Sequence, residues 1–142
     1  MAIKIHDQAA DDLVVPVPEG WPGINVSGFQ LHRSLEKKTD PGLLQNLLML
    51  AVTQVTENFD PETVLLPLEG ADRVNFEYAV YELAFAKLIP LLPVHNQLDS
   101  DRADPQKIEN QVRAAGRTSI EFQRRIPGFS PQVTRCFGSY AV

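Results

Sequence analysis

The chain has 142 residues, 44% of them hydrophobic, and a formal net charge of −5, which suits one small globular domain. No run of residues reaches the roughly 20 apolar positions that a membrane span requires, and the first residues lack the pattern of a secretory signal. The single cysteine, Cys136, excludes an intrachain disulfide and fits assembly in a reducing cytoplasm.

The charge is unevenly distributed. Residues 1–104 hold 7 Lys and Arg against 16 Asp and Glu, a net −9, whereas residues 105–142 hold 6 against 2, a net +4. This polarity favours head-to-tail contact between copies, or docking of the basic part on an acidic partner. The alternative is a solvated helix face with a chance bias. An acidic body of this kind argues against broad nucleic-acid binding, which needs clustered cations.

Residues 1–25 are predicted to form an extended N-terminal arm. The segment mixes prolines with large apolar side chains, and it shows no periodicity of its own. A flexible linker would be polar, so these apolar groups must be buried against the same subunit or a neighbour. Trp21 is the expected anchor of this arm.

Residues 26–126 predict an all-α fold, a small bundle of three main helices preceded by a short N-terminal helix. Asn25 is an N-cap for the short helix, near residues 26–35. Asp40-Pro41 starts the next helix, whose apolar positions recur at spacings of three and four as far as Phe59.

The third helix is expected over residues 72–89 and is apolar nearly all round, which is typical of a central helix or one covered by other copies. Asp104-Pro105 starts the fourth, which runs to Ile126 and stops at Pro127-Gly128. We expect large side chains of these helices to pack in the core or between subunits: Leu44, Leu48, Phe76, Tyr78, Tyr81, Phe85 and Phe122.

Residues 127–142 are predicted to form an extended C-terminal arm that mixes Pro and Gly with apolar groups. Such a tail cannot fold alone. It is expected to pack on a partner or back on its own subunit.

The sequence shows no catalytic signature, no metal site and no cofactor motif, and it predicts a non-enzymatic protein. His6, His32 and His95 lie in separate segments without ligand spacing. The acidic group Asp99–Asp104 lacks the glycine and the final glutamate of a calcium loop, so we interpret it as a solvated loop. Cys136 lies in an apolar tail and is read as a small buried hydrophobe. Glu77 and Glu82 are five residues apart, on different helix faces, and make no carboxylate pair.

The order of several short motifs resembles the head-completion (gpL-like) family of temperate contractile-tailed bacteriophages. These motifs are Trp21-Pro22-Gly23-Ile24-Asn25, Asp40-Pro41, the aromatic block of residues 76–82, Arg124-Arg125-Ile126-Pro127-Gly128 and Thr134-Arg135-Cys136. The similarity covers most of residues 14–142.

The resemblance implies a structural connector of the virion neck that is assembled in the host cytoplasm. Proteins of this kind form a ring, commonly of twelve copies, on the portal vertex after DNA packaging, and later neck and tail proteins dock on that ring. They enclose DNA without reading its sequence, and they use no membrane or cofactor. The resemblance also implies that the C-terminal arm docks on the portal protein, and we expect Phe129, Arg135, Phe137 and Tyr140 to make the contact.

Two other functions remain open at the level of sequence. The first is a different neck layer, a stopper or tail terminator, which is typically built around β-strands. The second is a small DNA-binding regulator that uses the arginines of the last helix, although no aromatic interleaving or helix-turn-helix glycine accompanies them.

Overall fold

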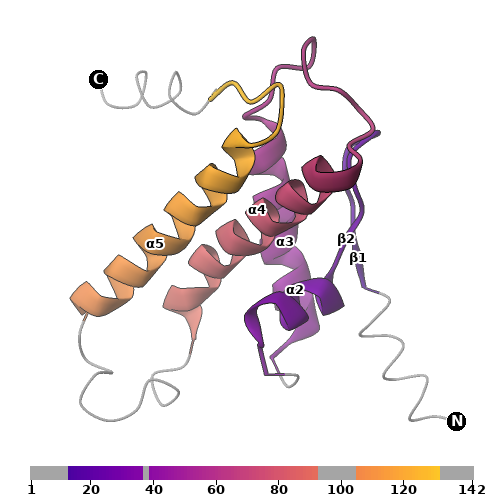
Figure 1. Ribbon diagram of the computed structural model, residues 1–142. Helices are drawn as coiled ribbons and strands as arrows, with labels where there is room; N and C mark the ends of the chain where they lie inside the picture. The colour runs from indigo at the N-terminus through magenta and orange to yellow at the C-terminus, as the bar shows by residue number, and fades with distance from the viewer. Residues whose placement is uncertain (1–12, 37–38, 93–104, 132–142) are drawn as a thin grey trace, which may run out of the picture.

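The computed structural model describes residues 13–36, 39–92 and 105–131, and it is predominantly helical (Figure 1). The helices follow the predicted order, one short helix before three long ones. Their bounds are α2 (Val26–Arg33), α3 (Pro41–Thr56), α4 (Gly70–Leu88) and α5 (Pro105–Arg124), and the 3-10 helix η1 (Ile89–Leu91) extends α4.

The prediction of a purely α fold is corrected by a small two-stranded sheet. Strands β1 (Val14–Val15) and β2 (Ile24–Asn25) pair antiparallel, with Val15 opposite Ile24, and both of these side chains are buried. β-Branched residues suit a pleated, half-buried surface. Two-residue strands show no alternation that a sequence pattern could reveal. The described part of the predicted N-terminal arm is therefore a hairpin attached to the body of its own chain.

Side-chain caps start the first two helices where the sequence predicts them. The Asn25 side chain accepts a hydrogen bond from the Gly28 amide at 2.8 Å, and Asp40 accepts one from the Gly42 amide at 3.1 Å. Pro41 occupies the first helical position of α3, where the missing N–H is not needed. Ser34 ends α2 in the left-handed conformation, with φ of 53°.

α4 is the central helix of the molecule. It packs against α5 on one side and α3 on another, and α2 crosses it (Figure 1). Phe76, Ala79, Val80 and Ala84 are fully buried along its length. The neighbouring helices of the same chain therefore account for much of the apolar surface that the sequence places around α4.

Small residues let α4 and α5 approach closely. Ala115 and Ser119 of α5 are buried against α4, and the Ser119 hydroxyl donates a hydrogen bond to the carbonyl of Ala79 at 2.7 Å. The buried Gln123 side chain extends this set of hydrogen bonds. Its Nε2 atom donates to the Ser119 hydroxyl at 3.1 Å, and its Oε1 atom accepts from Asn58 Nδ2 at 2.9 Å. The interior polar groups thus satisfy one another, as buried groups must.

Trp21 packs on the core of its own chain, between Phe59 at a ring distance of 5.4 Å and Phe76 at 5.0 Å. It connects the turn of the β1–β2 hairpin to the start of the segment that follows α3 and to the N-terminal half of α4. The connection between α3 and α4, residues 57–69, contains a cis peptide bond at Leu66-Pro67.

The segment after α5 also packs on its own chain. Phe59 and Phe129 form an isolated antiparallel bridge, with their rings 5.7 Å apart. The Ser130 amide donates to the Asn58 carbonyl at 2.7 Å, and the Asp60 amide donates to the Gly128 carbonyl at 3.0 Å. Residues 127–131 therefore belong to the helical body, so any arm that reaches a partner starts after Pro131.

Candidate functional site

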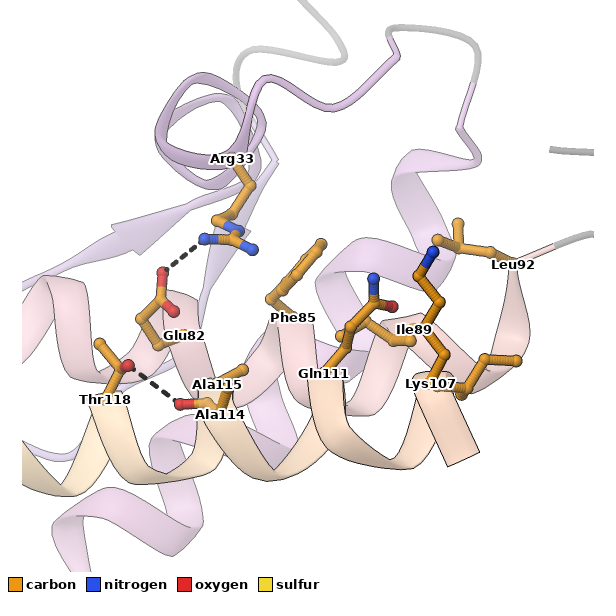
Figure 2. Close-up of a pocket in the computed structure, with 11 residues that line it drawn as sticks. Arg33, Glu82, Phe85, Ile89, Leu92, Lys107, Gln111, Ala114, Ala115 and Thr118 are labelled. Carbon is orange, nitrogen blue, oxygen red and sulfur yellow. Dashed lines mark hydrogen bonds and ion pairs between the residues drawn. The ribbon is translucent and has the colours of Figure 1, made fainter. Parts of the chain in front are cut away.

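A groove of about 540 Å³ lies between the C-terminal half of α4, the N-terminal half of α5 and the end of α2 (Figure 2). Phe85, Ile89, Leu92 and Ile108 give it an apolar lining. Lys107, Gln111, Thr118, Arg33 and Glu82 add polar groups around that lining.

Glu82 is the buried charge of this region, only 5% exposed. Its Oε2 atom accepts a hydrogen bond from His32 Nε2 at 2.7 Å and lies 3.4 Å from Arg33 Nη1. Burying a carboxylate without partners is costly, because water no longer solvates the charge. These two side chains of α2 supply the partners, so Glu82 attaches α2 to α4.

Aromatic rings surround the contact that His32 and Arg33 make with Glu82. The Arg33 guanidinium lies 3.7 Å from the centre of the Phe85 ring, a cation–π distance, and in Figure 2 it extends from α2 toward Glu82. The His32 ring lies 4.8 Å from that of Tyr78 and 5.3 Å from that of Tyr81.

Tyr81 also fixes how closely α2 approaches α4. A Cβ atom at Gly28 would overlap the Tyr81 hydroxyl, so a larger residue there would have to displace the Tyr81 side chain or move the two helices apart. Burial raises the pKa of Tyr81 to about 12, and the nearby Glu77 and Tyr78 add to the effect. Burial likewise lowers the pKa of Lys87, farther along α4.

The structure separates Glu77 from Glu82 as the sequence spacing predicts. Glu77 accepts from Arg73 Nε at 3.2 Å in an i,i+4 pair on the surface of α4, whereas Glu82 faces α2. Sequence reasoning missed the structural role of Glu82. The available signal was a carboxylate within a helix that is apolar nearly all round, together with His32 and Arg33 at the end of the helix before.

The residues predicted for core or inter-subunit packing occupy two environments. Leu44, Leu48 and Phe76 are fully buried in their own chain and Tyr81 nearly so, while Phe85 and Phe122 pack partly buried against the core. Tyr78 is 38% exposed and makes an edge contact with Phe122, at a ring distance of 5.4 Å.

Of the residues predicted to dock on the portal protein, Phe129 packs on Phe59 as described above. Arg135, Phe137 and Tyr140 lie outside the described residues, and their role stays a prediction. The loop acids Asp99–Asp104, together with Cys136, also fall outside that range.

Within residues 13–36, 39–92 and 105–131, the structure contains no group of His, Cys, Asp and Glu side chains that could hold a metal ion. None of the helices in the described part is both long and apolar enough to cross a membrane. Comparison of the chain with protein-family models, with curated proteins and with solved structures finds no match.

Proposed function

We propose that this protein is a structural head-to-tail connector of a contractile-tailed bacteriophage, an adaptor that forms a ring on the portal vertex and presents a platform to later neck proteins. The proposal starts from the motif order described above. A protein in this position works by contact, so the relevant property of its structure is the surface that it offers to neighbours.

The motif order carries the proposal, and a second observation is compatible with it: large apolar side chains are more than half exposed on several separate elements. They are Val14 in β1, Leu31 in α2, Leu50 in α3, Leu65 in the α3–α4 connection and Leu91 in η1. Single exposed apolar residues are normal on a monomer. Their spread over five elements suits a subunit that has neighbours on several sides.

The predominantly helical fold supports an adaptor over a stopper or tail terminator, which are typically built around β-strands. The net charge of the chain supports contact with proteins over readout of DNA. Salt-sensitive binding of the isolated chain to short duplexes would favour a DNA-binding regulator instead.

The test is co-purification with the portal protein of the same phage. We expect the full chain to bind the portal ring and a chain lacking residues 132–142 to lose that binding. This truncation keeps Phe129 and Ser130, which pack on residues 58 and 59, so helical content and melting temperature should be preserved. A truncated chain that binds the portal as well as the full chain would contradict the role of the arm. Failure of the full chain to bind would contradict the function.

A further inference from the structure

We propose that the outer face of α5 in one copy binds the acidic side of the next copy, where the β1–β2 hairpin turns and α3 connects to α4. This inference rests on the proposed function, which places copies side by side, and it names the surfaces that meet. The arginine face is the part of α5 that carries Arg117 and Arg124. The acidic surface is the hairpin turn with Glu19 and the α3–α4 connection with Glu62 and Glu69.

The arginine face offers two cations that no carboxylate of the described chain neutralises. Arg117 and Arg124 are exposed and lie seven residues apart, so they share one face of α5 and are about 10 Å apart along its axis. Within the described ranges neither side chain makes an ion pair, whereas Arg113 on the same helix pairs with Glu109. The two arginines therefore lack the partner that Arg113 has.

The sequence on either side of α5 does not supply that partner nearby. Residues 132–142 follow the end of the helix that carries Arg124, and they contain no Asp or Glu. The three aspartates of residues 99–104 precede the opposite end, and Pro105 is about 18 Å from Arg117 along the helix axis. We therefore look for the carboxylates on another molecule.

The acidic surface carries the opposite charge. Residues 13–25 and 57–69, which form the hairpin and the connection, contain no Lys, Arg or His. Glu19, Glu62 and Glu69 are exposed, and none of the three makes an ion pair within the part of the chain that the structure describes. Its charge thus complements that of the arginine face.

The two segments of the acidic surface touch and present an apolar side chain. Gly20 lies against the connection, because a Cβ atom there would come within 3.1 Å of the Leu66 Cβ atom. The adjacent Leu65 is 71% exposed. The aliphatic stem of an arginine covers apolar surface while its guanidinium contacts a carboxylate. An arginine face therefore suits both the leucine and the acids around it.

The arginine face and the acidic surface lie on opposite sides of the molecule. α5 packs on α4, α4 packs on α3, and β1 lies against α3. In Figure 1, α5 is accordingly at the left and the hairpin at the right. Two different surfaces on opposite sides cannot satisfy each other within one pair of copies. Repetition of the contact adds copies in one direction, which builds a ring or a filament.

The arrangement of charges on α5 favours a second copy over DNA. Glu121 is exposed between Arg117 and Arg124 on the same face, although it lies within ion-pair distance of neither. A continuous row of phosphates would pass this carboxylate and be repelled by it. The carboxylates of the acidic surface are spaced, with the uncharged Leu65 between Glu62 and Glu69 in the sequence.

Exchange of charge between the two surfaces tests the contact. One variant carries Arg117→Glu and Arg124→Glu, and the other carries Glu62→Arg and Glu69→Arg. Sedimentation velocity at low salt should show that each variant alone associates at least about tenfold more weakly than the native chain. An equimolar mixture should recover the association, because native surfaces then meet native ones and reversed surfaces meet reversed ones. Added salt should weaken association of the native chain and of the mixture.

Net charge is controlled in two ways. The Glu62→Arg and Glu69→Arg variant adds +4 to the net charge of −5 and has −1, so weaker general repulsion would make it associate more rather than less. A chain with Asn46→Glu and Leu50→Glu gains negative charge at exposed positions of α3, outside both surfaces. It should associate within about twofold of the native chain. Circular dichroism checks that every variant keeps its helical content.

The proposal is overturned if the native chain stays monomeric at high concentration in low salt, if the reversed variants associate like the native chain, or if their mixture shows no recovery. A chain lacking residues 132–142 should still associate, and loss of association there would assign the contact to Arg135 or its neighbours instead. Portal co-purification separates the two ideas. Portal binding without self-association contradicts this contact alone, and self-association that depends on these charges without portal binding contradicts the proposed function alone.

Discussion

Glu82 of α4 and His32 of α2, 50 positions apart in the sequence, are joined by a hydrogen bond of 2.7 Å. With Arg33 they form the polar attachment between the short N-terminal helix and the central helix. Arg33 also lines the groove between α4 and α5, so this attachment fixes one wall of that groove.

Replacing Glu82→Gln should destabilise the fold by about 2–3 kcal/mol, because the partly exposed His32 and Arg33 lose the buried carboxylate that they surround. The control is Glu77→Gln. Glu77 pairs with Arg73 on the surface of α4, and loss of this pair should lower the free energy of unfolding by less than about 0.5 kcal/mol. Urea denaturation followed by circular dichroism measures both. Equal losses in the two variants would contradict the structural role of Glu82.

Gly128→Ala should be strongly destabilising, by about 2–4 kcal/mol. Gly128 has φ of +99°, and a Cβ atom there would come within 2.6 Å of the Val64 Cα atom. Gly116→Ala is the matched control: it lies inside α5 with open space around the added atom, and it should stabilise the helix by about 0.5–1 kcal/mol. Thermal unfolding of the two variants should shift the melting temperature in opposite directions.

Gly28→Ala should lower the free energy of unfolding by about 1–3 kcal/mol, because the new methyl group meets the Tyr81 hydroxyl where α2 crosses α4. Removing that hydroxyl with Tyr81→Phe should recover part of the loss. A double-mutant cycle on unfolding free energies gives the coupling. Strict additivity of the two substitutions would show that the two positions do not touch.

The raised pKa of Tyr81 predicts a loss of stability at alkaline pH. A tyrosine whose folded pKa is about 12, against an ordinary value of 10.0, favours the folded state while it is protonated. Its contribution is fully present below pH 10 and disappears as the pH rises from 10 to 12. Ultraviolet titration should show one tyrosine that ionises late, and Tyr81→Phe should remove that phase while Tyr78→Phe should retain it.

Local signals in the sequence were enough to predict the helices. Caps at Asn25 and Asp40, prolines at the helix starts and apolar spacing placed all four helices in order, and most of their ends fall within a few residues of the prediction. The expectation of a purely α fold was wrong, because the β1–β2 pairing joins two very short segments that carry no strand periodicity.

The candidate site depends on contacts that no local pattern encodes. His32 and Glu82 meet because α2 crosses α4 at Gly28, and the angle of that crossing follows from packing across the whole core. The groove between α4 and α5 likewise requires the end of α2 to lie beside the C-terminal half of α4. Sequence reasoning could name an acidic body and a basic C-terminal part, but it could not say which surfaces carry those charges.

The bridge between Phe59 and Phe129 has a consequence for the order of events during synthesis. It closes a loop of about 70 residues that contains both α4 and α5, and such distant contacts form late, because the entropy of loop closure must be overcome first. A chain emerging from the ribosome cannot complete this bridge until Phe129 has left the exit tunnel. Until then, the part of the Phe59 ring that contacts Phe129 in the folded chain is open to solvent or to a chaperone.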